Sequence, residues 1–232
     1  MEKVKSMLEI DIKRKSFGEN IIIEDLNVSI PQGECISVLG RSGIGKSTLL
    51  KIISGLDSDY QGKILLDENE VTSPTKEISL MMQNHKLLLW LKVKDNIKFI
   101  NSNISDQEIT SYLKKVGILN KKNEWPNRLS GGEKTRVAIA VAFINHSRVL
   151  LLDEPFADID IGVKKDIWNL LLEIRKQNNT AILITTHNVE DALSISERVL
   201  VIGNNPSTII FDSKITKDNK EQIKDSLISF LS

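Results

Sequence analysis

Apolar and polar residues alternate with a two-residue period near the N-terminus. Leu8, Ile10 and Ile12 form one alternating set, and Leu26, Val28 and Ile30 form a second. This period is typical of half-buried strands. Pro31-Gln32-Gly33 then predicts a turn into a third, continuously apolar strand at Cys35–Leu39. The first forty residues are therefore predicted to be mainly β-structure.

Further along the chain, continuously apolar runs predict strands that are buried on both faces, as in parallel sheets. They lie at Ile78–Met82, Val149–Leu152 and Ala181–Thr185, and a shorter strand is expected to open at Gly62 and continue through Ile64–Leu66. Each of the three long runs is followed by polar residues. Ligands of parallel α/β sheets bind beyond the carboxyl ends of the strands, so these residues are candidates for a site.

Helices are predicted where capping residues precede apolar residues at helical spacing. Ser105 and Glu108 form a capping box for a helix through Val116 that Gly117 ends. The stretch from about 84 to 127 is predicted to be helical and to be inserted into the α/β core. Asp160 is predicted to cap another helix. The C-terminal residues predict a strand at Ile209–Phe211, followed by a charged helix whose apolar side carries Ile223, Leu227 and Leu231.

The most informative stretch is Gly40–Thr48, which reads Gly-Arg-Ser-Gly-Ile-Gly-Lys-Ser-Thr and fits the phosphate-loop pattern between a strand and a helix. Its glycines let backbone N–H groups approach phosphate oxygens, and the N-terminus of the following helix favours anions. Lys46 is expected to contact the β- and γ-phosphates and Ser47 to bind Mg²⁺. The alternative is a glycine-rich turn followed by a chance Lys-Ser pair.

Two adjacent carboxylates, Asp153 and Glu154, end the apolar run that starts at Val149. Neighbouring side chains of a strand point to opposite faces, so the two carboxylates are expected to have different roles. One can bind Mg²⁺ and the other can accept a proton from an attacking water. His187 and Gln83 follow strands of the same sheet edge. Each is a candidate for contacts beside the γ-phosphate, or else an ordinary structural or loop residue.

Ser130 and Glu133 form a second capping box around Gly131 and Gly132. Glycine in a helix costs about 1 kcal/mol relative to alanine. Two glycines in one first turn therefore indicate close backbone approach to an anionic ligand, although a well-capped helix is the simpler interpretation. Phe17, in a predicted turn, is either an adenine-stacking aromatic or a core residue.

Composition excludes several classes. The 232 residues carry zero formal net charge, with 41% hydrophobic and 27% charged residues, which is ordinary for a globular α/β protein and gives no sign of nucleic-acid binding. No run approaches the roughly 18 apolar residues of a membrane span, and Met1–Asp11 does not resemble a signal peptide. The single cysteine, Cys35, precludes an internal disulfide and is expected to be buried.

Taken together, these motifs resemble the nucleotide-binding subunit of ABC transporters over about residues 8–205. The landmarks occur in the family's order: Walker A at 40–48, the Q-loop Gln83, the signature at 129–133, Walker B at 149–154, the D-loop Asp160 and the switch His187. The resemblance implies one α/β domain: a P-loop NTPase core with a parallel sheet, an N-terminal antiparallel β subdomain, an inserted helical subdomain at about 84–145, and a short C-terminal tail at about 206–232.

The resemblance also implies a mechanism. Two subunits dimerise head to tail around two ATP molecules with Mg²⁺. Asp153 and Gln83 join Ser47 around the metal, Glu154 polarises the attacking water, and His187 contacts the γ-phosphate. The implied nucleotide-binding residues are Phe17, Gly40, Arg41, Ser42, Gly43, Ile44, Gly45, Lys46, Ser47, Thr48, Ser130, Gly131, Gly132 and Asp160, of which Ser130 and Gly132 serve the ATP of the opposite subunit.

Three residues depart from the common family pattern. Glu133 stands where Gln is usual, Val141 where Arg is frequent, and Ala157 where Ser is usual. We expect ATP hydrolysis to survive the first change because it lies past the phosphate-contacting residues. The other two are expected to affect the fine tuning of the dimer contact.

Leu87–Val93 resembles a stretch of importers for nitrate, sulfonates, taurine and related organic anions, or for thiamine precursors, with Leu89 in place of Pro. The implied partners are transmembrane permease subunits and, indirectly, a solute-binding protein, at the cytoplasmic face of the membrane. The region of Trp90 is then either the permease docking surface or ordinary core. A soluble ABC ATPase without a transport role and a non-hydrolysing nucleotide-binding module are the alternative functions.

Overall fold

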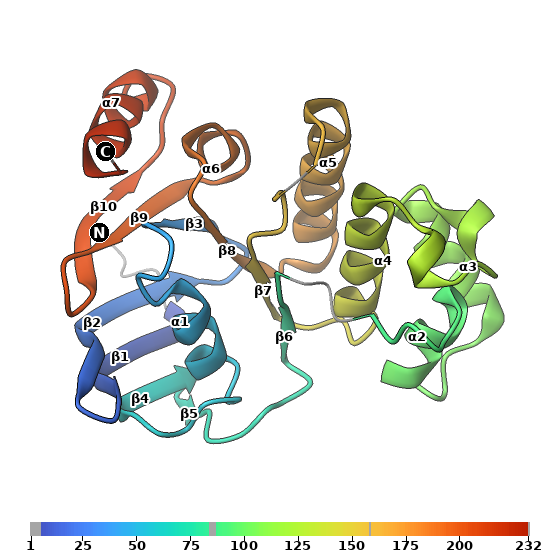
Figure 1. The fold of residues 1–232 in the computed structure, drawn as a ribbon, viewed down its shortest axis with the longest axis horizontal. Helices are drawn as coiled ribbons and strands as arrows, with labels where there is room; N and C mark the ends of the chain where they lie inside the picture. Colours follow the sequence, from blue (N-terminus) through green and yellow to red (C-terminus); the bar gives the residue numbers. More distant parts are fainter. Residues whose placement is uncertain (1–5, 84–86, 158, 232) are drawn as a thin grey trace.

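A four-stranded antiparallel sheet is built from the N-terminal third of the chain. The computed structural model describes residues 6–83, 87–157 and 159–231. The strands are ordered β2 (Asn20–Pro31), β1 (Ser6–Phe17), β4 (Gln61–Leu66) and β5 (Asn69–Glu70) (Figure 1). The alternating apolar residues face each other across β1 and β2 in the pairs Leu8–Ile30, Ile10–Val28 and Ile12–Leu26, all of them buried. The predicted N-terminal strands are therefore confirmed.

A six-stranded sheet forms the centre of the molecule. Its order is β10 (Thr208–Lys214), β9 (Arg198–Gly203), β3 (Cys35–Leu39), β8 (Ala181–Thr186), β7 (Val149–Asp153) and β6 (Ile78–Met81). All neighbours pair in parallel except β10, which pairs antiparallel with β9. Every residue of β3, β7 and β8 is buried, as their continuous apolar runs predict.

Both faces of this sheet are covered. On one face, α1 (Lys46–Ile53) and the antiparallel sheet pack against Val149 and Leu151 of β7. On the other face, α4 (Gly131–Phe143) and α5 (Ile161–Asn178) pack against Leu150 and Leu152. A third apolar cluster lies under α6 (Val189–Ile195) and α7 (Lys220–Leu231) and includes Ile223 and Leu227.

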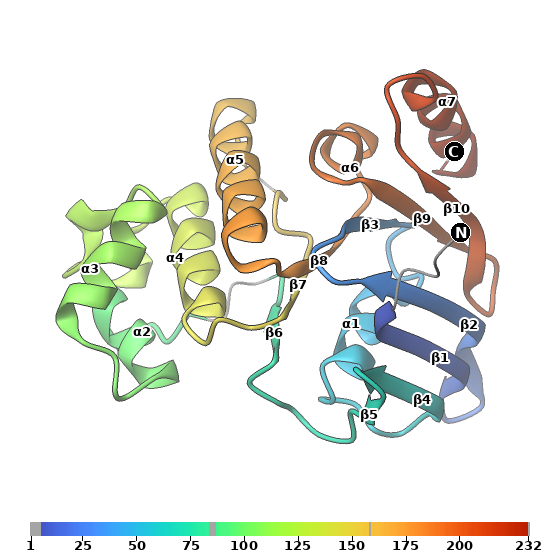
Figure 2. The same ribbon diagram turned by 180° about the vertical axis from the view of Figure 1, so that it is seen from behind.

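The helices α2 (Val93–Ile100) and α3 (Asp106–Lys115) lie beside α4, at the end of the molecule away from the antiparallel sheet (Figure 2). Two short 3₁₀ turns, Leu119–Lys121 and Pro126–Arg128, connect α3 to α4. Both predicted capping boxes are confirmed at the starts of α3 and α4. The start of the predicted helical region at residues 84–86, and the last residue, Ser232, lie outside the described residues.

Some local predictions differ from the structure. The strand expected to open at Gly62 begins one residue earlier, because Gln61 pairs with Arg14 of β1. Asp160 is the N-cap residue of α5, but its side chain makes no capping hydrogen bond. Trp90 is 71% exposed, so the interpretation of its region as core is wrong for this residue. In the part of the chain that the structure describes, no helix is long and apolar enough to cross a membrane.

Candidate functional site

A cleft of about 860 Å³ lies beyond the carboxyl ends of β3, β6, β7 and β8. It collects most of the predicted site residues from distant parts of the chain. Its lining consists of Phe17, Ile22, Gly40, Arg41, Ser42, Gly43, Gly45, Lys46, Ser47, Thr48, Gln83, Asp153, Glu154, His187 and Leu231. Such a position is where parallel α/β sheets bind their ligands, and the volume suits a nucleotide-sized molecule.

The loop between β3 and α1 has the backbone of an anion site. Gly45, the N-cap residue of α1, has φ 107°, a conformation that other residues rarely adopt. A Cβ atom on Gly45 would lie 2.9 Å from Cγ2 of Ile22, so the loop also packs too closely on β2 for a larger residue. The N-terminus of α1 thus opens into the cleft, where its N–H groups favour a phosphate.

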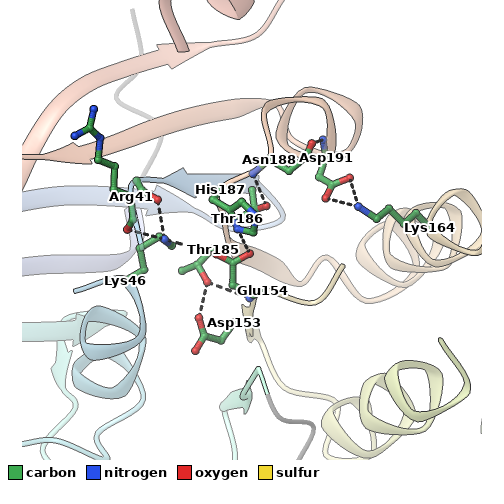
Figure 3. Close-up of polar contacts among 11 residues, drawn as sticks. Arg41, Lys46, Asp153, Glu154, Lys164, Thr185, Thr186, His187, Asn188 and Asp191 are labelled. Carbon is green, nitrogen blue, oxygen red and sulfur yellow. Dashed lines mark hydrogen bonds and ion pairs between the residues drawn. The ribbon is translucent and has the colours of Figure 1, made fainter. Parts of the chain in front are cut away.

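Lys46 brings a buried positive charge to this loop. Its Nζ donates to the carbonyl oxygens of Gly40 at 2.7 Å and Arg41 at 3.1 Å, and lies 3.6 Å from Oε1 of Glu154 (Figure 3). The ammonium group is therefore held over the loop by two neutral acceptors and one carboxylate. Phosphate oxygens entering the cleft would meet a cation that is already oriented.

The two carboxylates at the end of β7 have different surroundings but line the same cleft, because the strand ends at Asp153 and its alternation of side chains does not continue to Glu154. Asp153 is buried and accepts a hydrogen bond from Oγ1 of Thr185 at 2.7 Å. Glu154 has φ 47°, and its N–H donates to the carbonyl oxygen of Thr185 at 3.1 Å. For a non-glycine residue, this left-handed backbone conformation is strained by on the order of 1–3 kcal/mol, and such strain is found mostly at functional sites. Thr185 thus holds the carboxylate of Asp153 and the backbone of Glu154, and no sequence pattern indicated this residue.

His187 lies at the rim of the cleft. Its side chain is 67% exposed, and its Nδ1 lies 3.1 Å from Oε2 of Glu154, whose side chain is 10% exposed. The histidine therefore has one buried partner and one side toward solvent. Gln83, which follows β6, is exposed and also lines the cleft.

The cleft offers Ser47, Gln83 and Asp153 as ligands for a divalent cation. Among the described residues, no group of three or more His, Cys, Asp or Glu side chains is arranged to hold a metal. Mg²⁺ does not require such a cage, since it usually keeps several waters and binds one or two carboxylates together with substrate phosphates. A hydroxyl, an amide and one buried carboxylate fit that ion.

The remaining predicted residues lie apart from the main cleft. Ser130, Gly131, Gly132 and Asp160 line a separate depression of about 180 Å³ at the start of α4 and α5. A Cβ atom on Gly132 would lie 2.9 Å from Cγ1 of Val163, so packing against α5 accounts for part of the requirement for glycine. Ile44, also predicted, does not line the main cleft.

The capping box at this depression uses Glu133. Ser130 N–H donates to Oε2 of Glu133 at 2.9 Å, and Glu133 N–H donates to Oγ of Ser130 at 3.3 Å. The hydrogen bond from the Ser130 backbone is the main cause that lowers the pKa of the Glu133 carboxyl, with the nearby Lys121 ammonium adding to it. The first turn of α4 is thereby fixed with Ser130 exposed at its tip.

Phe17 forms part of the wall of the main cleft and is 56% exposed, so it is not a core residue. The Nζ of Lys15 lies 4.6 Å from its ring centroid. Lys15 is itself buried and is held by Asp57 at 2.9 Å and by the carbonyl oxygen of Asp59 at 2.6 Å. The Phe17 ring therefore lies against the Lys15 ammonium group, which Asp57 and Asp59 hold in place. No sequence pattern indicated Lys15, Ile22 or Leu231 as neighbours of the site.

An apolar surface lies next to Gln83, around a groove of about 280 Å³. Phe99 and Ile100 line this groove and are exposed. Leu89 and Trp90 are also exposed but do not line the groove; they lie in the turn that follows Leu88. The buried Asn96 fixes the turn that carries Trp90, since its amide bonds the backbone of Leu88, Leu91 and Lys92. This turn therefore presents large apolar side chains to solvent on a rigid backbone.

The chain is similar to known proteins along most of its length. Residues 23–157 match a family model described as "ABC transporter". The chain is 35% identical to an aliphatic sulfonates import ATP-binding protein, SsuB 2, of Pseudomonas syringae pv. tomato, over 97% of this chain and 94% of that relative.

Two solved structures are similar in fold. The cbiO1 protein of Clostridium perfringens, described as part of the ABC transporter complex cbiONQ, is 26% identical, with a TM-score of 0.80 over 96% of this chain and 92% of that chain. An ATP-binding cassette solved as a dimer in a post-hydrolysis state, with ADP and Pi, is 27% identical, with a TM-score of 0.79 over 90% of this chain and 99% of that chain.

Proposed function

This chain belongs to the ABC transporter family, and from that premise we propose that it is the ATP-hydrolysing subunit of a membrane importer for aliphatic sulfonates. The family accounts for ATP binding and hydrolysis. The choice of cargo rests on the import function named for the relatives that are 34–38% identical. Nitrate, taurine-like anions and thiamine precursors are competing cargoes.

The nucleotide occupies the main cleft. Its phosphates lie against the Gly40–Thr48 loop and Lys46, and its adenine stacks on the exposed ring of Phe17. Ser47, Asp153 and Gln83 would hold Mg²⁺. When bound, the ion neutralises charge on the β- and γ-phosphates.

Hydrolysis depends on Glu154, and its position is the observation that carries the proposal. It is nearly buried, it faces the cleft, and it lies between Lys46 at 3.6 Å and His187 at 3.1 Å. A carboxylate in this position orients a water and accepts its proton as the water attacks the γ-phosphate. His187 contacts the γ-phosphate and keeps Glu154 in place. The presence of both groups argues against a non-hydrolysing module.

A complete site requires a second copy of the chain. Ser130, Gly131, Gly132 and Asp160 lie in a depression separate from the cleft that contains Lys46. In a head-to-tail dimer, Ser130 and Gly132 of one subunit cover the γ-phosphate held by the other. The similarity to a cassette solved as a dimer supports this arrangement.

The surface around Trp90 docks the membrane partner. It exposes the large apolar side chains of Leu89, Trp90, Phe99 and Ile100. Exposed apolar groups gathered in this way are typical of an interaction site. A transmembrane permease subunit covers it at the cytoplasmic face of the membrane, and a solute-binding protein delivers the cargo to that permease. Nucleic acid has no part in this function.

We also propose the domain boundaries. The whole chain forms one nucleotide-binding domain, in which about residues 84–145 form the helical subdomain that carries Trp90 and Ser130. About residues 206–232 form a short tail that includes β10 and α7.

Purification of the native complex through a tag on this chain, in mild detergent, tests the function. We expect a polytopic permease to co-purify, Mg-dependent ATPase activity to change with that permease, and reconstituted vesicles to take up a radiolabelled alkanesulfonate when ATP is present. Uptake of nitrate or a thiamine precursor instead would overturn the assignment of sulfonates as the cargo. Recovery of ribosomes, of DNA-repair factors or of no partner, with undiminished ATPase activity, would identify a soluble ABC ATPase.

A further inference from the structure

A partly buried ion pair joins two helices outside the main cleft. Nζ of Lys164, on α5, lies 3.0 Å from Oδ2 and 3.2 Å from Oδ1 of Asp191, on α6 (Figure 3). The side chains are only 16% and 6% exposed. Neither residue lines the main cleft or the depression at Ser130.

Each partner lies near the start of its helix, four residues after a residue of the proposed site: Lys164 after Asp160, and Asp191 after His187. Lys164 N–H donates to the carbonyl oxygen of Asp160 at 2.9 Å. Asp191 N–H donates to Oδ1 of Asn188 at 2.9 Å. Asn188 N–H in turn donates to Oγ1 of Thr186 at 3.0 Å, so the loop that carries His187 is bonded on both sides of it.

The ion pair therefore completes a continuous path between the two parts of the site. The path runs from Asp160 through the first turn of α5 to Lys164, across the ion pair to Asp191, and through the Asn188 cap to the loop of His187. His187 is bonded in turn to Glu154. A shift of the start of α5 would move the histidine relative to Glu154.

Electrostatics make this link sensitive to the loss of either charge. Burial raises the pKa of the Asp191 carboxyl, and the nearby Glu190 raises it further. The Lys164 ammonium lowers this pKa most strongly, and His187 lowers it as well. Removing one partner of a buried pair leaves the other charge uncompensated, which is more disruptive than the loss of a surface contact. The pair is thus a specific link and not an interchangeable surface contact.

We propose that Lys164 and Asp191 are positioning residues for ATP hydrolysis, which hold His187 against Glu154 and make its position depend on the start of α5 at Asp160. This inference rests on the proposed ATPase function. It assigns a role in turnover, not in nucleotide binding, to two residues that do not touch the nucleotide.

A double-mutant cycle on the full-length chain tests the proposal. Lys164→Met is expected to lower kcat about tenfold or more and to change the KM for ATP less than about twofold, because misplacement of a catalytic group by ~1 Å can cost up to about 10²-fold. In a His187→Ala background the same substitution is expected to change kcat less than about twofold, because its effect acts through His187. Lys164→Arg is expected to restore most of the activity.

Two further variants separate positioning from folding. Lys165→Met alters the exposed neighbouring lysine of α5 and is expected to leave kcat unchanged. Asp191→Asn removes the charge, retains the backbone donor to Asn188 and leaves no uncompensated carboxylate, so it tests the link should Lys164→Met fail to fold. It is expected to lower kcat with little change in KM.

The outcomes are distinct. Unchanged kcat in Asp191→Asn or in a folded Lys164→Met, an equal loss in the His187→Ala background, or a parallel loss of ATP affinity would each overturn the positioning role while leaving the ATPase function intact. Absence of hydrolysis by the wild-type chain and its complex would overturn the proposed function, and this inference with it.

Discussion

Glu154 and His187 are in direct contact at the edge of the main cleft, with Oε2 of the carboxylate 3.1 Å from Nδ1 of the imidazole. They come from the ends of neighbouring parallel strands, β7 and β8, which place them side by side. Glu154 is fixed further by its backbone bond to Thr185 and by the ammonium of Lys46 at 3.6 Å. The carboxylate is thus held by contacts within the protein itself.

Substitution Glu154→Gln tests the catalytic role of this carboxylate. We expect turnover to fall by about 10²-fold or more, since the amide cannot accept the proton of the attacking water. ATP binding is expected to remain, and an ATP-bound dimer should accumulate on size-exclusion chromatography. Single-turnover hydrolysis at the wild-type rate would refute the role.

Substitution Phe17→Ala tests the stacking surface for adenine. Stacking of a base on an aromatic ring contributes about 1–3 kcal/mol, so the Kd for ATP is expected to rise about fivefold or more. Phe17→Tyr, which keeps the ring, should stay within about twofold of the wild type. Because Phe17 is more than half exposed, the melting temperature should change little. Equal ATP affinity in the Ala and Tyr variants would show that the ring does not stack.

Glu133→Gln tests the departure from the common signature residue. A glutamine oxygen can still accept the Ser130 N–H bond, so ATPase activity is expected to stay within about twofold of the wild type. The lowered pKa of Glu133 adds stability that is present above its unfolded pKa and is lost as the pH falls through the folded pKa. The difference in melting temperature between the two proteins should therefore shrink as the pH falls from the ordinary glutamate pKa of 4.5 through the lower pKa of the folded state.

Glu108→Gln is a matched control for that effect. Glu108 belongs to the capping box of α3, outside the site, and its pKa is lowered mainly by the Ser105 hydroxyl and backbone N–H. It should show a similar acid dependence of stability with unchanged ATPase activity. If the difference in melting temperature between Glu133→Gln and the wild type persists at acid pH, the charge of Glu133 is not the cause of that difference.

Trp90→Ala tests the docking surface. The side chain is 71% exposed, so the ATPase activity and stability of the isolated chain should not change. Co-purification with the permease is expected to be lost, because large aromatic residues commonly dominate the binding energy of an interface. Leu56→Ala, which removes another exposed apolar side chain in the turn after α1, should leave assembly intact. Normal assembly of Trp90→Ala would place the permease elsewhere.

The local structure and the chemistry of the site follow from short stretches of sequence. The apolar alternation of Leu8–Ile12 and the continuous run Val149–Leu152 predict strands because burial of one face or two imposes these patterns. The capping boxes at Ser105 and Ser130 and the phosphate loop at Gly40–Thr48 are equally local. Each depends on residues a few positions apart, so each is readable without the fold.

The contacts between distant residues, by contrast, are set by the folded arrangement of the chain. Thr185 bonds Asp153 because β7 and β8 pair in one register, and Lys164 meets Asp191 because α5 and α6 pack side by side. The exposure of Trp90 likewise depends on the Asn96-fixed turn. These contacts depend on the relative placement of whole elements, and the pattern of a single segment records which face is buried but not what lies against it.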